Sequence, residues 1–105
     1  MIVRFAEDWL RELYEKGECS DKHHRFQPQV VSKYALRVAT LQNSARVEAL
    51  YPLHSLNYKV LTGDKKGISS IRIDDKYRLE FTVHIEDTEP SVTICTIKDI
   101  SNHYD

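Results

Sequence analysis

Long apolar runs, cysteine clusters and a strong excess of either charge are all missing from this 105-residue chain. No apolar run approaches the 18 or more residues that a membrane-spanning helix requires. Arg4, Glu7 and Asp8 lie within the first eight residues, which do not resemble a secretory signal. The length suits one domain over residues 1–105, because such a chain can bury a single core but not two. We therefore expect a cytoplasmic, single-domain protein without a membrane segment.

Cysteine and histidine are also too sparse to suggest a metal centre. Cys19 and Cys95 lack a CxxC spacing, and in a reducing compartment both are expected to be free thiols. His23 and His24 are adjacent, so their side chains point in different directions, and no third ligand stands at a recognisable spacing. We expect neither a metal nor a cofactor.

Charge is nearly balanced overall but unevenly distributed along the chain. A net charge of −1 lacks the basic excess that is typical of a free-standing nucleic-acid-binding protein. Residues 59 to 78, however, carry six basic and three acidic side chains, a local charge of +3. The basic residues are Lys59, Lys65, Lys66, Arg72, Lys76 and Arg78. This segment is either a phosphate-binding surface or simply a solvated hairpin of mixed charge.

The first half of the chain has the pattern of a strand followed by helices. Ile2 to Phe5 is a short β-prone run, and apolar residues at helical spacing predict a helix from Ala6 to Lys16. After a loop, a second helix is expected from Pro28 to about Gln42, since proline is well tolerated in a first helical turn. A short helix is expected from Ser44 to Leu50.

The second half alternates polar and apolar residues as strands do. Leu53 to Val60 is expected to be an irregular connector, followed by a β-hairpin that turns at residues 74–76 and by a last strand from Ser91 to Ile100. This order of elements predicts an α+β fold with a small antiparallel sheet of about four strands and two to three helices packed on one face.

Within the hairpin, Leu79 and Phe81 are expected on the core side of the strand and Arg78 on the solvent side. A solvent-exposed arginine would be a natural phosphate clamp, because its fork of donors suits the oxygens of a phosphate and its charge never titrates. Its removal should then cost little stability. Alternatively, Arg78 forms an ion pair within the sheet, for example with Asp99.

A family resemblance rests on the same segment. Residues 61–67 read Leu-Thr-Gly-Asp-Lys-Lys-Gly, the next strand ends in Arg-Ile at 72–73, and residues 77–81 read Tyr-Arg-Leu-Glu-Phe. This arrangement resembles the toxins of the HigB branch of the RelE/ParE superfamily, the plasmid maintenance killer proteins. It is close over the second half of the chain and depends elsewhere on length and element order. The resemblance implies a RelE/ParE-like fold.

The resemblance also implies a function and partners. Toxins like HigB are ribosome-dependent messenger-RNA endonucleases that inhibit translation, and each is held inactive by a helix-turn-helix antitoxin, HigA. The ribosome, messenger RNA and a HigA-like antitoxin are thus the expected partners, and operator DNA is bound only through the antitoxin complex. Two alternatives stay open: a ParE-like inhibitor of DNA gyrase, and an interaction module on the same fold that has lost activity.

Site residues follow from the chemistry and the resemblance together. RNA can be cleaved by attack of its 2′-hydroxyl on the next phosphate, which requires a proton acceptor, cations and a proton donor but no metal. Arg78 matches the arginine of the toxin motif, while Lys59 stands near the place of a histidine that these toxins carry before the glycine turn. His103 and Tyr104 are the expected acid or base, although the toxins end in Asp-Tyr-His. The expected RNA contacts are Lys65, Lys66, Arg72 and Lys76.

Overall fold

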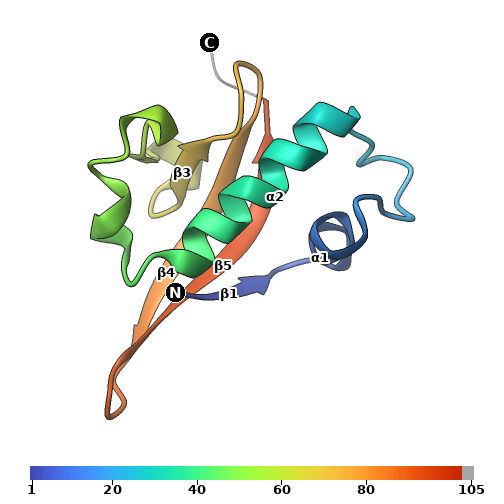
Figure 1. The fold of residues 1–105 in the computed structure, drawn as a ribbon. Coiled ribbons are helices and arrows are strands. Elements are labelled where there is room, and N and C mark those ends of the chain that lie inside the picture. Colours follow the sequence, from blue (N-terminus) through green and yellow to red (C-terminus); the bar gives the residue numbers. More distant parts are fainter. Residues whose placement is uncertain (103–105) are drawn as a thin grey trace.

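The structure is a computed structural model, and it describes residues 1–102. Two helices lie on one face of a five-stranded sheet (Figure 1). The strands and helices are β1 (Ile2–Phe5), α1 (Asp8–Lys16), α2 (Pro28–Asn43), β2 (Lys59–Val60), β3 (Ser69–Arg72), β4 (Arg78–Glu86) and β5 (Val92–Ser101). Three short 3-10 turns are η1 (Val47–Leu50), η2 (His54–Leu56) and η3 (Gly63–Lys65). The predicted α+β class is confirmed.

The sheet has the order β1-β5-β4-β3-β2, so the last strand in the sequence lies inside the sheet. Neighbouring strands are antiparallel except for β1, which pairs with β5 in parallel, from Ile2 opposite Ile94 to Phe5 opposite Ile97. The sheet has one strand more than the expected four because β2, only two residues long, forms within the predicted irregular connector. The described chain contains no helix that is long and apolar enough to cross a membrane.

Helices α1 and α2 form where the apolar spacing predicts them, within two residues at each end, but the short helix expected from Ser44 to Leu50 is only the 3-10 turn η1. In α2, Val30, Tyr34, Val38 and Leu41 recur on one face and are all buried. The hydroxyl of Tyr34 donates a hydrogen bond of 2.8 Å to the carbonyl of Leu10, which fixes α2 against α1. A buried hydroxyl needs such a partner, because leaving it unpaired would cost free energy.

Helix α1 ends at Gly17, whose φ of 76° lies in the left-handed region that favours glycine. The loop that follows is anchored by His24, whose imidazole stacks on Trp9 with ring centroids 3.7 Å apart and planes 5° apart. His24 also contacts the carboxylate of Asp21 through Nδ1, at 2.9 Å. These contacts explain how a loop without apolar periodicity holds its shape.

One core lies between the helices and the sheet. Its strand residues include Ile71, Leu79, Phe81 and Ile97, all fully buried and all on the face that α1 and α2 cover. Both cysteines are free thiols, as predicted. Burial raises the pKa of the Cys95 thiol to about 12, so the neutral form is strongly favoured.

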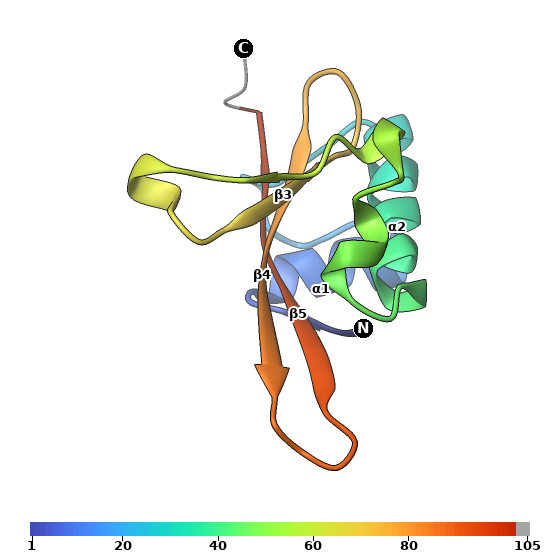
Figure 2. The same ribbon diagram turned by 90° about the vertical axis from the view of Figure 1, so that its left-hand side faces the viewer.

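After α2 the chain crosses from the helical side to the opposite side of the sheet. In Figure 2 the helices stand on one side, and the segment carrying η3 extends from the other side, next to β3. The β4–β5 hairpin projects beyond the body of the molecule in both views. The face of the sheet away from the helices is therefore partly covered by the segment between η2 and β3.

Candidate functional site

A row of polar residues crosses four strands on the face away from the helices. Lys59 of β2 is opposite Ser70 of β3, Ser70 is opposite Glu80 of β4, and Glu80 is opposite Asp99 of β5. Directly opposed residues point to the same face of a sheet. Because Leu79 points into the core, its neighbour Glu80 and the rest of the row point away from the helices. We call these four residues the polar row.

Arg78 lies beside this row, on the predicted face but not in solvent. Its side chain is buried, with 6% of the residue exposed. Nε donates to the hydroxyl of Ser70 at 2.5 Å, and one Nη donates to the carbonyls of Asn57 and Ser70 at 2.5 and 3.1 Å. The prediction that Arg78 is solvent-exposed is wrong, because the chain between η2 and β3 folds over it.

The backbone of Asn57 makes this cover possible. Its φ of 45° is left-handed, a conformation that asparagine tolerates better than most residues, and it ends η2. The turn directs the carbonyl of Asn57 at the guanidinium of Arg78. Arg78 thus ties the connector to the sheet and carries a fixed positive charge beside the polar row.

Lys65 brings a second positive charge to the row. Its Nζ lies 2.8 Å from Oε2 of Glu80, whose side chain is only 3% exposed, whereas that of Lys65 is 40% exposed. Gly63 and Gly67 bracket this lysine with φ of 67° and 88°, which lets the η3 segment curl back over the sheet. The predicted RNA contact at Lys65 is therefore also a contact that holds the segment in place.

Asp99 brings a half-buried carboxyl group to the row. Burial raises its pKa above the ordinary value, and the neighbouring carboxylate of Glu80 adds to the rise. The backbone N–H of Ile100, which donates to Asp99 Oδ1 at 2.9 Å, acts in the opposite direction, as does the charge of Lys65. A half-buried carboxyl group whose pKa is shifted toward neutrality is suited to accepting and returning a proton.

The other predicted residues are more dispersed. Lys59 is exposed at the opposite end of the row from Asp99. The steps from β2 to β5 separate the Cα atoms of the two residues by about 14 Å at the usual spacing of strands. Lys66 is exposed beside Lys65. His103 and Tyr104 lie outside the described residues. Among residues 1–102, no three histidine, cysteine, aspartate or glutamate side chains gather as they would around a metal ion.

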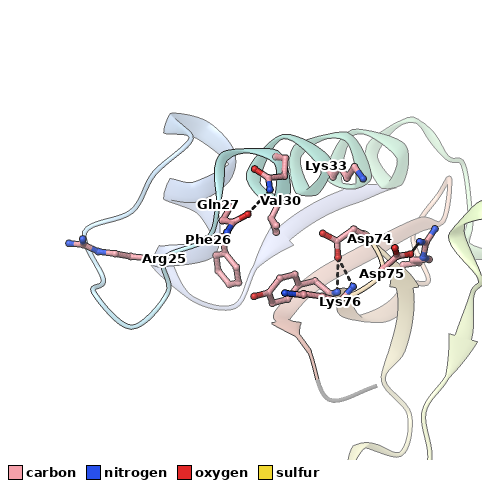
Figure 3. A pocket seen from close by; sticks show the side chains of 11 residues that line it. Arg25, Phe26, Gln27, Val30, Lys33, Asp74, Asp75 and Lys76 are labelled. Atoms are coloured by element: carbon pink, nitrogen blue, oxygen red, sulfur yellow. Dashed lines mark hydrogen bonds and ion pairs between the residues drawn. The ribbon is translucent and has the colours of Figure 1, made fainter. Parts of the chain in front are cut away.

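Arg72 and Lys76 belong to a different place, a cavity of about 400 Å³ between the start of α2 and the β3–β4 turn. Figure 3 shows Lys33 of α2 above this cavity, across from Asp74 and Lys76 of the turn. Arg72 forms an ion pair with Asp75, and Asp74 accepts hydrogen bonds from the backbone of Lys76. Acidic and basic groups are mixed there, so the cavity is not a simple phosphate site.

Sequence reasoning gave no role in the site to four residues that build it, Asn57, Ser70, Glu80 and Asp99, and considered Asp99 only as a possible ion-pair partner of Arg78. The alternation of the hairpin strands already places Ser70 and Glu80 on the face of Arg78. Asp99 reaches the row only because β5 pairs with β4 in the register that sets it opposite Glu80. A bulge after this pair shifts the register of β4 against β5, which a reading of single strands does not detect.

Comparison with known proteins gives one consistent picture. Residues 3–92 match the model of a HigB-like toxin family, described as the RelE-like toxin of the type II toxin-antitoxin system HigB. Toxin HigB-1 of Vibrio cholerae serotype O1 is 32% identical over 82 residues, which are 77% of this chain and 82% of that protein.

A solved structure adds the fold. The YoeB/ParE toxin from Agrobacterium tumefaciens superposes with a TM-score of 0.57 over 99% of this chain and 100% of that chain. At 16% identity this likeness concerns the fold alone. Together with the sequence matches, it confirms the resemblance found in the glycine turn and the hairpin: the chain belongs to the HigB-like family of RelE-type toxins of type II toxin-antitoxin systems.

Proposed function

We propose that the protein is a ribosome-dependent endoribonuclease that cleaves messenger RNA and thereby inhibits translation. Toxins of the HigB family are typically ribonucleases. The observation that carries the proposal is the cluster around Asp99, where a proton acceptor with a raised pKa lies on the same face as Lys65 and Arg78. Cleavage by an RNA 2′-hydroxyl needs this combination of a proton acceptor and cations.

In the proposed reaction, Asp99 takes the proton of the 2′-hydroxyl as its oxygen attacks the adjacent phosphorus. The bond from phosphorus to the 5′-oxygen of the next nucleotide then breaks, leaving a 2′,3′-cyclic phosphate and, once that oxygen is protonated, a 5′-hydroxyl. His103 or Tyr104 is the proposed proton donor. The fixed charges of Arg78 and Lys65 stabilise the negative charge that develops on the phosphate.

Lys59 has a separate proposed role. Because the polar row places it about 14 Å from Asp99, it cannot hold the phosphate that reacts at Asp99. Its exposed ammonium group is instead suited to a neighbouring phosphate of the same strand. Lys66, next to Lys65, would contribute in the same way.

Membership of a type II system implies a cognate antitoxin. We propose that this antitoxin is a HigA-like helix-turn-helix protein, that the pair binds operator DNA through the antitoxin, and that the target of the free toxin is messenger RNA on the ribosome. The protein would then act in the cytoplasm.

The test is to induce the protein in bacteria without its antitoxin and to map the 5′ ends of messenger RNA by primer extension. New ends inside translated frames, absent when translation initiation is blocked, are expected. Asp99→Asn should remove them, whereas Glu89→Gln, the same carboxylate-to-amide change on the projecting hairpin, should not. Growth arrest with intact messages would favour gyrase as the target, and no arrest would favour the inactive module.

A further inference from the structure

The cavity of about 400 Å³ between the start of α2 and the β3–β4 turn has no role in the proposed reaction. It lies where the helix layer meets the end of the sheet, with α2 on one side of it and the turn on the other (Figure 3). None of the four residues of the polar row belongs to its lining. A group held in this cavity is therefore bound apart from the polar row.

Aromatic and apolar side chains form one wall of the cavity. The rings of Phe26 and Tyr77 meet edge to face, with centroids 5.3 Å apart and planes 84° apart. Both residues are half-buried, and Val30 in the same lining is 6% exposed. An edge-to-face ring pair is a favourable arrangement, so this wall is already in place before a ligand binds. It offers apolar surface to the stem of an incoming side chain.

Two lysines stand on opposite sides of the cavity. Lys33 comes from α2 and Lys76 from the turn (Figure 3), and both are exposed. Within residues 1–102, neither ammonium group has a hydrogen-bond or ion-pair partner. Arg25, another basic residue of the lining, points away from the cavity in the same view. Helix α2 adds positive potential, because it begins with no side-chain cap and no acidic residue in its first turn.

The carboxylates of the lining are already engaged by the protein itself. Asp75 forms an ion pair with Arg72, and Asp74 accepts hydrogen bonds of 2.9 and 2.8 Å from two backbone N–H groups of the turn. Without Arg25, the lining holds three basic and two acidic side chains. One further carboxylate between the two lysines would balance this excess of positive charge.

The mixture of charges favours a protein ligand over RNA. Each nucleotide of an RNA strand adds a phosphate, and the neighbouring phosphates would be repelled by Asp74 and Asp75, whose side chain is 93% exposed. A protein segment can instead place one acidic side chain between Lys33 and Lys76 and carry neutral or basic residues on either side of it. The aromatic wall suits the apolar stem of that side chain.

We propose that this cavity is a docking site for the cognate antitoxin, and that an aspartate or glutamate of the antitoxin inserts between Lys33 and Lys76. The inference rests on the proposed function in taking the antitoxin as the partner, which membership of a type II system implies. It assigns Lys76 to a protein contact in place of the RNA contact expected from the sequence. RNA is the competing occupant.

The experiment measures the affinity of each variant for the purified cognate antitoxin by surface plasmon resonance, and for 2′-O-methyl hexa-adenylate by fluorescence anisotropy. The double variant Lys33→Gln/Lys76→Gln should weaken antitoxin binding about tenfold and leave RNA binding unchanged. Lys22→Gln, the same change at an exposed lysine outside the lining, should bind both partners like wild type. In the wild-type complex, a carbodiimide, which joins amines to carboxylates in contact, should link Lys33 or Lys76 to an acidic residue of the antitoxin.

Three results would overturn the docking site. Antitoxin binding might be unchanged in the double variant, RNA binding might weaken as much as antitoxin binding, or the cross-links might involve only lysines outside the cavity. None of these readouts requires cleavage. The expected pattern together with intact messages in cells would therefore refute the nuclease and leave the docking site standing, whereas new message ends with unchanged antitoxin binding would do the reverse.

Discussion

Replacing Arg78 by alanine should destabilise the fold and not merely silence the site. The guanidinium is buried, and its hydrogen bonds include those to the hydroxyl and carbonyl of Ser70 and to the carbonyl of Asn57. Hydrogen bonds from a charged group contribute about 1.5 to 3 kcal/mol each, and the cost of burying the charge offsets part of the total. We expect Arg78→Ala to lower the free energy of unfolding by about 2 to 4 kcal/mol, out of about 5 to 15 kcal/mol for a domain of this size.

Urea denaturation followed by the fluorescence of Trp9, the sole tryptophan and a buried one, would measure this loss. Lys59→Ala is the matched control, since it removes an exposed cation of the same face and should change stability by less than about 0.5 kcal/mol. If Arg78→Ala unfolds at the same urea concentration as Lys59→Ala, the hydrogen bonds of Arg78 to Ser70 and Asn57 do not hold the connector. If it is as costly as expected, a loss of toxicity in Arg78→Ala says nothing about catalysis, and Asp99→Asn is the better probe.

Three further predictions concern other residues. Because the pKa of Asp99 is raised in the folded state, wild type should lose stability relative to Asp99→Asn as pH rises above the ordinary aspartate value of 3.8, and below that value the difference should no longer change with pH; parallel pH profiles throughout would contradict the assigned burial effect. Lys59→Ala should reduce the salt dependence of RNA binding by about one unit of log–log slope, and an unchanged slope would mean that Lys59 contacts no phosphate. In a thiol-reagent assay of the native protein, Cys19 should react and the buried Cys95 should not until the chain unfolds; rapid reaction of two thiols would show that the core opens readily.

The helices and the hairpin were predictable because local patterns determine them. The apolar spacing of α2 describes one buried face, and proline at its start and the polar break at its end define its length. Alternation in β4 also assigned Arg78 and Glu80 to the face away from the helices. These are properties of neighbouring residues, and neighbours in sequence are enough to reveal them.

Whether a face of the sheet is covered depends on residues that are distant in the sequence. The prediction that Arg78 is solvent-exposed failed for this reason. Alternation says that Arg78 points away from the core but not that Asn57, twenty-one positions earlier, folds over it. The parallel pairing of β1 with β5 also joins distant segments, and no local sequence pattern in either strand predicts it. The stacking of His24 on Trp9 likewise joins a loop to a helix, and no periodic sequence pattern predicts this contact.

Because β5 lies between β1 and β4 in the sheet, the site cannot form before β5 has been synthesised. Synthesis proceeds from the N-terminus, and domains form as units once the chain has emerged. Strand β1 has no partner in the sheet until residues 94–97 are made, and Glu80 does not face Asp99 until still later. The polar row is therefore completed only after β5 has been made, and no shorter stretch of the chain that lacks residue 99 can assemble this cluster.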